Sequence, residues 1–372
     1  MIRFDRATKR YPDGTVAVDE LDLDAPSGKI TVLVGPSGCG KTTSLRMINR
    51  MIEPTSGTIW LDETDTASIP AHELRRQIGY VIQHAGLFPH RTIVDNIATV
   101  PFLLGTDKKQ ARARAMELLE RVGLDPAFAR RYPGQLSGGQ QQRVGVARAL
   151  AADPPVMLMD EPFSAVDPVV RDQLQDEFLR LQDELGKTIV FVTHDIDEAI
   201  KLGDQVAVLR VGGTLAQLAA PHELLSRPVD AFVAGFVGRD RGYRALGFAQ
   251  VSSLNPHDEP TLTMGDPVPD GSDHAGFVLV VNTEREPQGW LNLGEVGRGT
   301  AITEDLIYRG GTLATEGGTL RAALDACLSS PSGRGVVVDE AGRLVGSVSA
   351  REVLDLIEAQ AVGEPQASGT VS

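Results

Sequence analysis

A glycine-rich segment near the start of the chain combines the residue types that can hold a row of phosphate groups. It runs from Gly35 to Thr42 and fits the pattern G-x-x-x-x-G-K-[ST]. In this pattern the glycines let backbone N–H groups wrap phosphate oxygens, the lysine reaches the outer phosphates, and the hydroxyl holds Mg²⁺. We therefore predict nucleotide binding here. The candidate residues are Gly35, Pro36, Ser37, Gly38, Cys39, Gly40, Lys41, Thr42 and Thr43.

A second glycine-rich segment, Leu136–Gln140, follows further along the chain. If it opens a helix, its small residues let the N-terminus of that helix approach a γ-phosphate with unpaired N–H groups and the positive dipole end. One nucleotide pocket rarely needs both glycine motifs, so we expect two chains packed head to tail to complete two sites. The candidate residues are Ser137, Gly138, Gly139 and Gln140.

Two adjacent carboxylates, Asp160 and Glu161, end the apolar run Val156–Met159. A buried strand that ends in such a pair can place one carboxylate on Mg²⁺ and the other beside an attacking water. We assign Asp160 to the metal, together with Thr42, and Glu161 to the general base. The alternative, a solvated acidic turn, is disfavoured by the glycine motif upstream.

The elements that position these residues follow from the pattern of apolar residues and turns. Strands are expected at Ile2–Ala7, Val16–Leu23 and Ile30–Val34, and a helix at Thr42–Met51. Strand, loop and helix in this order are the context that the first glycine motif requires.

Helical spacing in Asp107–Val122 and Gln140–Ala151 predicts a helical insertion over about residues 86–150. Two buried strands, Val156–Met159 and Ile189–Thr193, follow it and are separated by the amphipathic stretch Val169–Leu185. This order is the βαβ rhythm of a parallel sheet. The fold class of the nucleotide domain is therefore α/β.

Length and composition limit the function classes. A chain of 372 residues exceeds the usual size of one core, so we expect two domains. No apolar run is long enough to cross a bilayer, and no signal peptide begins the sequence. Two cysteines fit a reducing cytoplasm, and a formal net charge of −14 argues against binding to nucleic acid.

A linker at residues 239–258 is predicted from the loss of periodicity there, ahead of a second domain at 259–358. This C-terminal part is acidic and contains no lysine. Its expected elements are Phe277–Val281, Gln288–Asn292, Thr319–Leu328, Gly335–Val338, Leu344–Ser349 and Ala350–Ile357. Residues 359–372, rich in Gly, Pro, Ser and Gln, are expected to be a disordered tail.

Together, the first glycine motif, Leu136–Gln140, Asp160-Glu161-Pro162 and a histidine after a strand, His194, resemble the ATP-binding subunit of an ABC transporter. The resemblance covers residues 1–238. It implies a P-loop NTPase with a RecA-like core, an antiparallel β-subdomain and a helical subdomain, with ATP and Mg²⁺ as cofactors. It also implies a homodimer that closes on ATP and drives a membrane permease from the cytoplasmic face of the membrane.

The resemblance also implies roles for single residues. Tyr11 resembles the aromatic residue that stacks on adenine, and Gln83 resembles the loop glutamine that contacts Mg²⁺ or water and senses the permease. His194 resembles the switch histidine that holds the γ-phosphate and the water. Asp167 resembles the loop aspartate that crosses the dimer interface. Its segment is Ser-Ala-Val-Asp, where family members often carry Gly-Ala-Leu-Asp.

Three further segments are similar in sequence to the ATP-binding subunits of importers of quaternary amines, such as glycine betaine, choline, carnitine and proline betaine. They are Gly79–Gln83, Gly86–His90 and Phe236–Arg241. Such importers receive cargo from an extracytoplasmic substrate-binding protein. The C-terminal part resembles a pair of CBS modules, the first degenerate and the second well matched by Gly335–Asp339 and Gly342–Gly346. Such modules could bind an adenine nucleotide or cyclic dinucleotide, sense ionic strength, or only support the dimer.

Three other functions remain as alternatives. The ATPase could serve the import of another small solute, act outside transport on nucleic acid or the translation machinery, or be an inactive ATPase attached to a nucleotide-binding regulator. A single phosphate loop, a short helical insertion and negative net charge disfavour the second. The third is disfavoured by Lys41, Glu161 and His194, which are all present.

Overall fold

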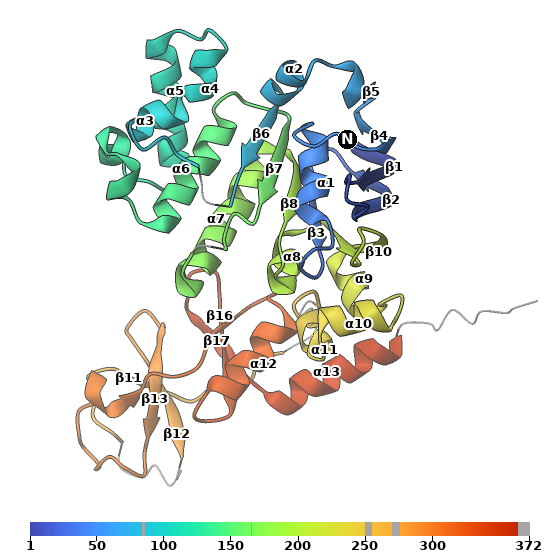
Figure 1. Ribbon diagram of the computed structural model, residues 1–372. Coiled ribbons are helices and arrows are strands. Elements are labelled where there is room, and N and C mark those ends of the chain that lie inside the picture. Colours follow the sequence, from blue (N-terminus) through green and yellow to red (C-terminus); the bar gives the residue numbers. More distant parts are fainter. Residues whose placement is uncertain (84–85, 165, 250–254, 270–275, 364–372) are drawn as a thin grey trace, which may run out of the picture. The chain divides into compact units, whose positions relative to one another are not determined.

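The computed structural model describes residues 1–83, 86–164, 166–249, 255–269 and 276–363 (Figure 1). It divides into two compact units, Met1–Gly238 and Arg239–Ser372. No helix among the described residues has the length and apolar character needed to span a membrane.

A six-stranded sheet in the order β10-β9-β3-β8-β7-β6 forms the centre of the first unit. Neighbouring strands are parallel except β10, which runs antiparallel to β9. Every residue of β3, β7 and β8 is buried, as in sheets covered by helices on both faces. The strands are β3 (Ile30–Val34), β6 (Ile78–Val81), β7 (Val156–Asp160), β8 (Thr188–Val192), β9 (Gln205–Leu209) and β10 (Leu215–Ala219).

An antiparallel sheet, β2-β1-β4-β5, lies on the other side of helix α1 (Lys41–Ile48) from the parallel sheet (Figure 1). One apolar cluster joins all three, with Phe4 and Leu21 from the antiparallel sheet, Leu45 from α1 and Leu158 from β7. The antiparallel strands are β1 (Ile2–Arg10), β2 (Val16–Ala25), β4 (Ser56–Leu61) and β5 (Thr64–Asp65).

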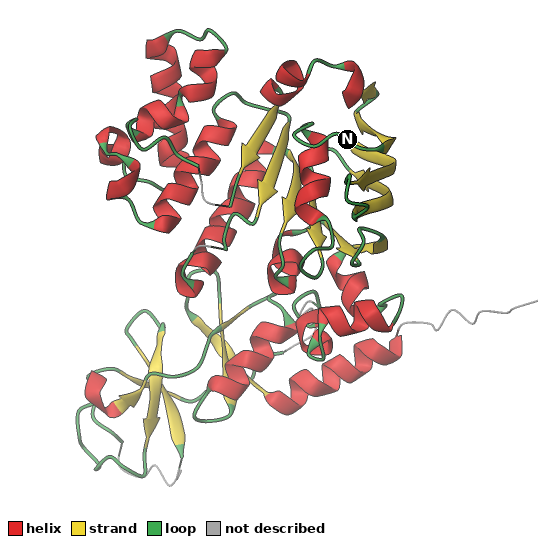
Figure 2. Cartoon of the chain, viewed as in Figure 1, coloured by secondary structure: helices red, strands yellow, loops and turns green. Residues whose placement is uncertain are grey.

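The segment between β6 and β7 is helical, as predicted, and forms a separate group of helices (Figure 2). Its entry is fixed by Asn96, a fully buried side chain. The Asn96 amide donates to the carbonyls of Phe88 and Arg91, and its oxygen accepts the N–H of Phe88 at 2.7 Å. The helices are α3 (Ile93–Ile97), α4 (Thr99–Leu103), α5 (Lys108–Arg121) and α6 (Gly138–Leu150).

The remaining helices of the first unit flank the parallel sheet or follow it. They are α2 (Ala71–Arg76), α7 (Pro168–Leu185), α8 (Ile196–Leu202), α9 (Pro221–Ser226) and α10 (Ala231–Val237). Helix α7 connects β7 to β8 and α8 connects β8 to β9, which gives the βαβ order expected from the sequence.

The second unit contains two small sheets, β11-β12-β13-β14 and β15-β16-β17. Gly342 turns the chain between β16 and β17 with φ 80°, and its N–H donates to the carbonyl of Asp339 at 3.0 Å. Its strands are β11 (Thr261–Thr263), β12 (Phe277–Val281), β13 (Pro287–Asn292), β14 (Ile307–Tyr308), β15 (Ala314–Thr315), β16 (Arg334–Val338) and β17 (Leu344–Ser349). Its longer helices are α12 (Leu320–Ser329) and α13 (Ala350–Gly363).

The expectation of an aperiodic linker at residues 239–258 is wrong for the part that the structure describes. Helix α11 (Arg241–Ala245) begins there, and Tyr243, Leu246 and Ala249 pack against the core of the second unit. These apolar residues recur every three positions, a helical spacing too short to stand out in the sequence. His257 then exchanges two backbone hydrogen bonds with Ser347, of 2.8 and 2.9 Å. Residues 250–254 lie outside the described residues.

The predicted start of the disordered tail, residue 359, is wrong because it lies inside helix α13. Helix α13 continues through Gly363, since residues 359–361 are Ala-Gln-Ala, which are good helix formers. Residues 364–372 lie outside the described residues.

Candidate functional site

The first glycine motif connects β3 to α1 in a backbone conformation that only glycine adopts without strain. Gly38 and Gly40 have φ of 79° and 88°. A Cβ atom on Gly40 would lie 2.1 Å from the carbonyl oxygen of Ala17, so the motif also packs closely against β2. The loop therefore presents backbone N–H groups at the start of a helix, which is a suitable cradle for anions.

Lys41 lies inside this loop with 8% of its surface exposed. Its ammonium donates to the carbonyls of Gly35 and Pro36 at 2.7 and 3.1 Å. A pocket of about 620 Å³ opens above the loop. It is lined by the nine predicted residues from Gly35 to Thr43, by Glu161 and His194, and by Ala17 and Phe236.

Thr42 and Asp160 meet at one end of this site. The Thr42 hydroxyl donates to Oδ1 of Asp160 at 3.0 Å, and the Arg46 guanidinium lies 3.9 Å from Oδ2. Burial raises the pKa of Asp160, because the carboxylate loses hydration, and the hydrogen bond from Thr42 opposes this shift. A hydroxyl and a carboxylate that point at each other are oxygen ligands that Mg²⁺ accepts, so the residues present fit this ion.

Two other predicted residues, Gln83 and His194, converge on one carboxylate oxygen of a third, Glu161. Oε2 of Glu161 accepts a hydrogen bond from the Gln83 amide at 3.3 Å and lies 3.1 Å from Nδ1 of His194. These residues follow β6, β7 and β8, whose carboxyl ends meet at one edge of the sheet. Glu161 has φ 47°, and its N–H donates to the carbonyl of Val192 at 2.9 Å. The turn aims its side chain at the edge of the sheet.

The other predicted binding residues do not line this pocket. Tyr11 lies between β1 and β2, with the Lys9 ammonium 5.4 Å from its ring centre. Asp167 is exposed, and its carbonyl accepts the N–H of Arg171 at the start of α7. Ser137 and Gln140 cap α6 reciprocally, because each side chain accepts the other's backbone N–H, at 3.3 and 3.0 Å. Gly138 and Gly139 form the first turn of α6.

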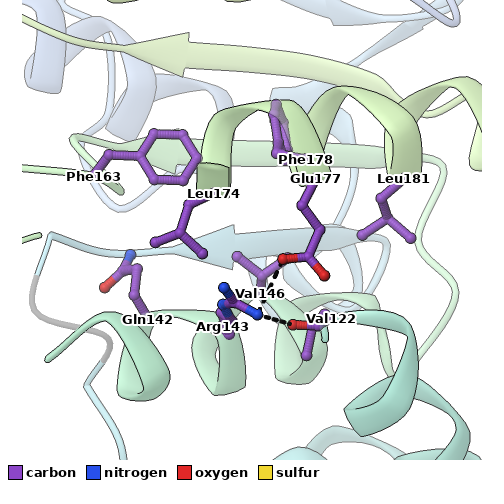
Figure 3. A pocket seen from close by; sticks show the side chains of 9 residues that line it. All are labelled: Val122, Gln142, Arg143, Val146, Phe163, Leu174, Glu177, Phe178 and Leu181. Atoms are coloured by element: carbon purple, nitrogen blue, oxygen red, sulfur yellow. Dashed lines mark hydrogen bonds and ion pairs between the residues drawn. The ribbon is translucent and has the colours of Figure 1, made fainter. Parts of the chain in front are cut away.

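Arg143 holds α6 against α7 beside a small apolar hollow of about 40 Å³ (Figure 3). Its Nη1 lies 3.0 Å from the Glu177 carboxylate and donates to the carbonyls of Val122 and Gly123. A Cβ atom on Gly123 would lie 2.2 Å from that carboxylate. The hollow is far too small for a nucleotide. We therefore interpret the ion pair between Arg143 and Glu177 as a structural contact that orients α6, and with it the Ser137–Gln140 segment.

Phe236 and Ala17 also line the nucleotide pocket, although neither was predicted as a site residue. Phe236 comes from α10, where its ring stacks on Phe232 with centroids 6.4 Å apart. The Arg210 guanidinium lies 4.7 Å from the Phe232 ring and pairs with Asp230, the cap of α10. The spacing of Phe232 and Phe236 predicts a helix, but no sequence signal brings that helix to the pocket.

A phosphate loop between a parallel strand and a helix, with carboxylates at the end of a neighbouring strand, defines a P-loop NTPase. A family model described as "ABC transporter" matches residues 18–164. The osmoprotectant import ATP-binding protein OsmV of Salmonella typhimurium is 42% identical, over 96% of each chain. The chain belongs to the ATP-binding proteins of ABC transporters, a family of ATPases.

Two further comparisons agree with this membership. The glycine betaine/carnitine/choline transport ATP-binding protein OpuCA of Bacillus subtilis is 40% identical, over 96% of each chain. The dimeric structure of a post-hydrolysis state of the ATP-binding cassette MJ0796, bound to ADP and Pi, is 34% identical with a TM-score of 0.55. It covers 59% of this chain and 99% of its own.

Proposed function

We propose that this chain is the energy-coupling ATPase of an importer for quaternary ammonium osmoprotectants, such as glycine betaine, choline, carnitine or proline betaine. The observation that carries the hydrolytic part is the convergence of Gln83, Glu161 and His194 beside the phosphate loop. The cargo is supported by relatives named for these solutes, whose similarity extends through the second unit.

In this proposal Glu161 is the general base that orients the attacking water, and His194 holds that water and the γ-phosphate. Lys41 exchanges its loop carbonyls for phosphate oxygens, since an ammonium forms its strongest hydrogen bonds with anions. Thr42, Asp160 and Gln83 would hold Mg²⁺, which when bound neutralises phosphate charge. Tyr11 stacks on the adenine.

The residues outside the pocket act on a second copy of the chain. In the proposed head-to-tail homodimer, Ser137–Gln140 and Asp167 of one chain complete the site of the other. The reciprocal cap takes up the N–H groups of Ser137 and Gln140, whereas Gly138 and Gly139 form the solvent-accessible start of α6, where their N–H groups and the positive dipole end suit a γ-phosphate. The solved relative MJ0796 is dimeric.

The proposed membrane partner is a permease, which the chain contacts from the cytoplasmic face of the membrane. Phe88 and His90 follow the Gln83 loop, with ring centroids 5.9 Å apart, and Phe88 is exposed. An exposed aromatic pair beside a residue of the hydrolytic site is a suitable receiving surface for a permease helix. The extracytoplasmic substrate-binding protein is then an indirect partner.

We propose that the second unit is regulatory and of CBS type. The order β15, α12, β16, β17, α13 supports one intact module, whereas β11–β14 lack the matching helices in the described residues. A pocket of about 630 Å³ in this unit is lined by Trp290, Arg309 and Arg334, among others. The Arg334 guanidinium lies 5.1 Å from the Trp290 ring. Cations and an aromatic face suit a nucleotide or another anion.

Uptake measurements test this function. The chain is co-expressed with its permease and substrate-binding protein, and ATP-dependent uptake of glycine betaine into vesicles is measured as internal salt is raised. We expect uptake that increases with salt and disappears in Glu161→Gln. Hydrolysis of ATP without movement of any quaternary amine would contradict the cargo and favour another small solute.

A further inference from the structure

One arginine side chain joins two loops that carry candidate site residues, at a distance from the nucleotide pocket. Arg171 lies in the first turn of α7, directly after the loop that holds Asp167. Its Nη2 donates to the carbonyl of Val166 at 3.1 Å. Its Nη1 lies 3.9 Å from Oδ2 of Asp195, the residue after His194. The guanidinium therefore contacts the Asp167 loop on one side and the His194 loop on the other.

Asp195 is a firm anchor for this contact, because it caps α8. Its Oδ1 accepts the backbone N–H groups of Asp197 and Glu198 at 2.9 and 3.4 Å. Its own N–H donates to the hydroxyl of Thr193 at 3.0 Å. A side chain that caps a helix in this way has little freedom to move separately from that helix.

A second polar contact fixes α7 against α8 one turn further on. The Gln175 amide donates to the Glu198 carboxylate at 3.1 Å, and the two side chains are 5% and 6% exposed. Burial raises the pKa of Glu198, while hydrogen bonds from Thr193 and Gln175 lower it. A buried polar pair is directional, so the two helices are held in one register where their preceding loops meet.

We propose that Arg171 is a positioning residue for ATP hydrolysis, which couples the Asp167 loop to the contact between His194 and Glu161. Arg171 does not line the pocket, so it acts through the residues it contacts. This inference rests on the proposed function, in which Asp167 reaches the site of the partner chain. A shift of that loop on dimer closure moves Arg171, then the Asp195 end of α8, and so the imidazole beside Glu161.

The test is steady-state ATP hydrolysis by the full-length chain, with Arg171→Gln and a matched control, Asp172→Asn. Asp172 pairs with Lys201 at 2.5 Å across the same two helices, but it contacts neither loop through that pair. We expect Arg171→Gln to lower kcat about tenfold, as a small misplacement of reacting groups does, with KM for ATP unchanged. We also expect the Hill coefficient of Arg171→Gln for ATP to fall toward one. Asp172→Asn is expected to keep the wild-type kcat and the wild-type Hill coefficient. The kcat of Arg171→Lys is expected to lie between those of the wild-type chain and Arg171→Gln, because lysine keeps the charge without the planar fork.

A double-mutant cycle keeps the test decisive if Arg171→Gln folds poorly, which thermal unfolding reports. Asp195→Asn keeps the capping oxygen and loses the charge, so we expect it to lower kcat in the wild-type chain and to lower it less in Arg171→Lys, where the planar fork that Asp195 meets is already gone. Equal kcat in Arg171→Gln and Asp172→Asn, or additive losses in the cycle, overturns the inference. Unchanged turnover in Glu161→Gln contradicts the proposed function instead, so the two failures are distinguishable.

Discussion

Nδ1 of His194 lies 3.1 Å from Oε2 of Glu161, although the two residues follow different strands of the parallel sheet. The contact exists because β7 and β8 pair in register, with Asp160 opposite Val192. The relative position of Glu161, the proposed general base, and His194 is therefore fixed by backbone pairing of fully buried strands.

Replacing the carboxylate of Glu161 with an amide separates binding from hydrolysis. Glu161→Gln preserves the size of the side chain and removes its basicity, so we expect turnover to fall by about 10²-fold or more while ATP binding is retained. Closed dimers then accumulate with ATP, which size-exclusion chromatography detects. Glu63→Gln, a change of the same kind at an exposed turn residue between β4 and β5, is the matched control. Wild-type turnover in Glu161→Gln would contradict the assignment of Glu161 as the general base.

Removing the ammonium of Lys41 weakens nucleotide binding itself. A charge-assisted hydrogen bond contributes about 1.5–3 kcal/mol, so we expect Lys41→Ala to raise the Kd for ATP by at least tenfold. Titration with a fluorescent ATP analogue measures this change. Lys29→Ala removes an exposed lysine that pairs with Asp204, and it keeps the wild-type Kd. Equal Kd values for the two variants would contradict the role of Lys41.

The buried carboxylate of Asp160 costs stability at neutral pH. Its pKa is raised, so the folded chain binds more protons than the unfolded chain in the window above the ordinary value of 3.8. The free energy of unfolding therefore decreases as pH rises through that window. We expect Asp160→Asn to raise Tm at pH 7 in chelator-treated protein, and to lose this advantage at pH 3.5. A lower Tm at pH 7 would show that the ionised carboxylate is stabilising.

Glu352 makes the opposite contribution in the second unit. Hydrogen bonds from His257 and from the backbone and hydroxyl of Ser349 lower its pKa from 4.5 to about 2. The stabilisation is complete above pH 4.5 and is lost as pH falls toward 2. The side chain is 37% exposed, so solvent screening limits the effect of Glu352→Gln at pH 7 to about 1 kcal/mol or less.

Urea unfolding, followed through buried Trp290 in a Trp60→Phe background, measures the effect of Glu352→Gln in the second unit. Glu340→Gln, a change of the same kind at an exposed turn residue, is the control. A difference between the variants that persists unchanged at pH 2 would contradict this origin of the stability.

The sequence was most informative where a local pattern and a chemical motif coincide. The strand before Gly35 and the strand before Asp160 are short apolar runs bounded by residues with specific chemistry, and both lie where they were expected. Phe236 could not be predicted as a pocket residue, because its position depends on the packing of α10 near Arg210. Helix α11 was missed for a related reason, since a five-residue helix shows too few apolar repeats to be recognised.

The two cysteines are both buried from solvent, but they lie in different units of the chain. Cys39 is fully buried in the phosphate loop of the first unit, and Cys327 is 1% exposed in α12 of the second, where its thiol donates to the carbonyl of Val348. Neither thiol can meet a bulky reagent until its own surroundings open. The chain thus carries one buried thiol in each unit without any added cysteine. The rate at which a reagent labels Cys39 reports local opening of the first unit, and the rate for Cys327 reports local opening of the second.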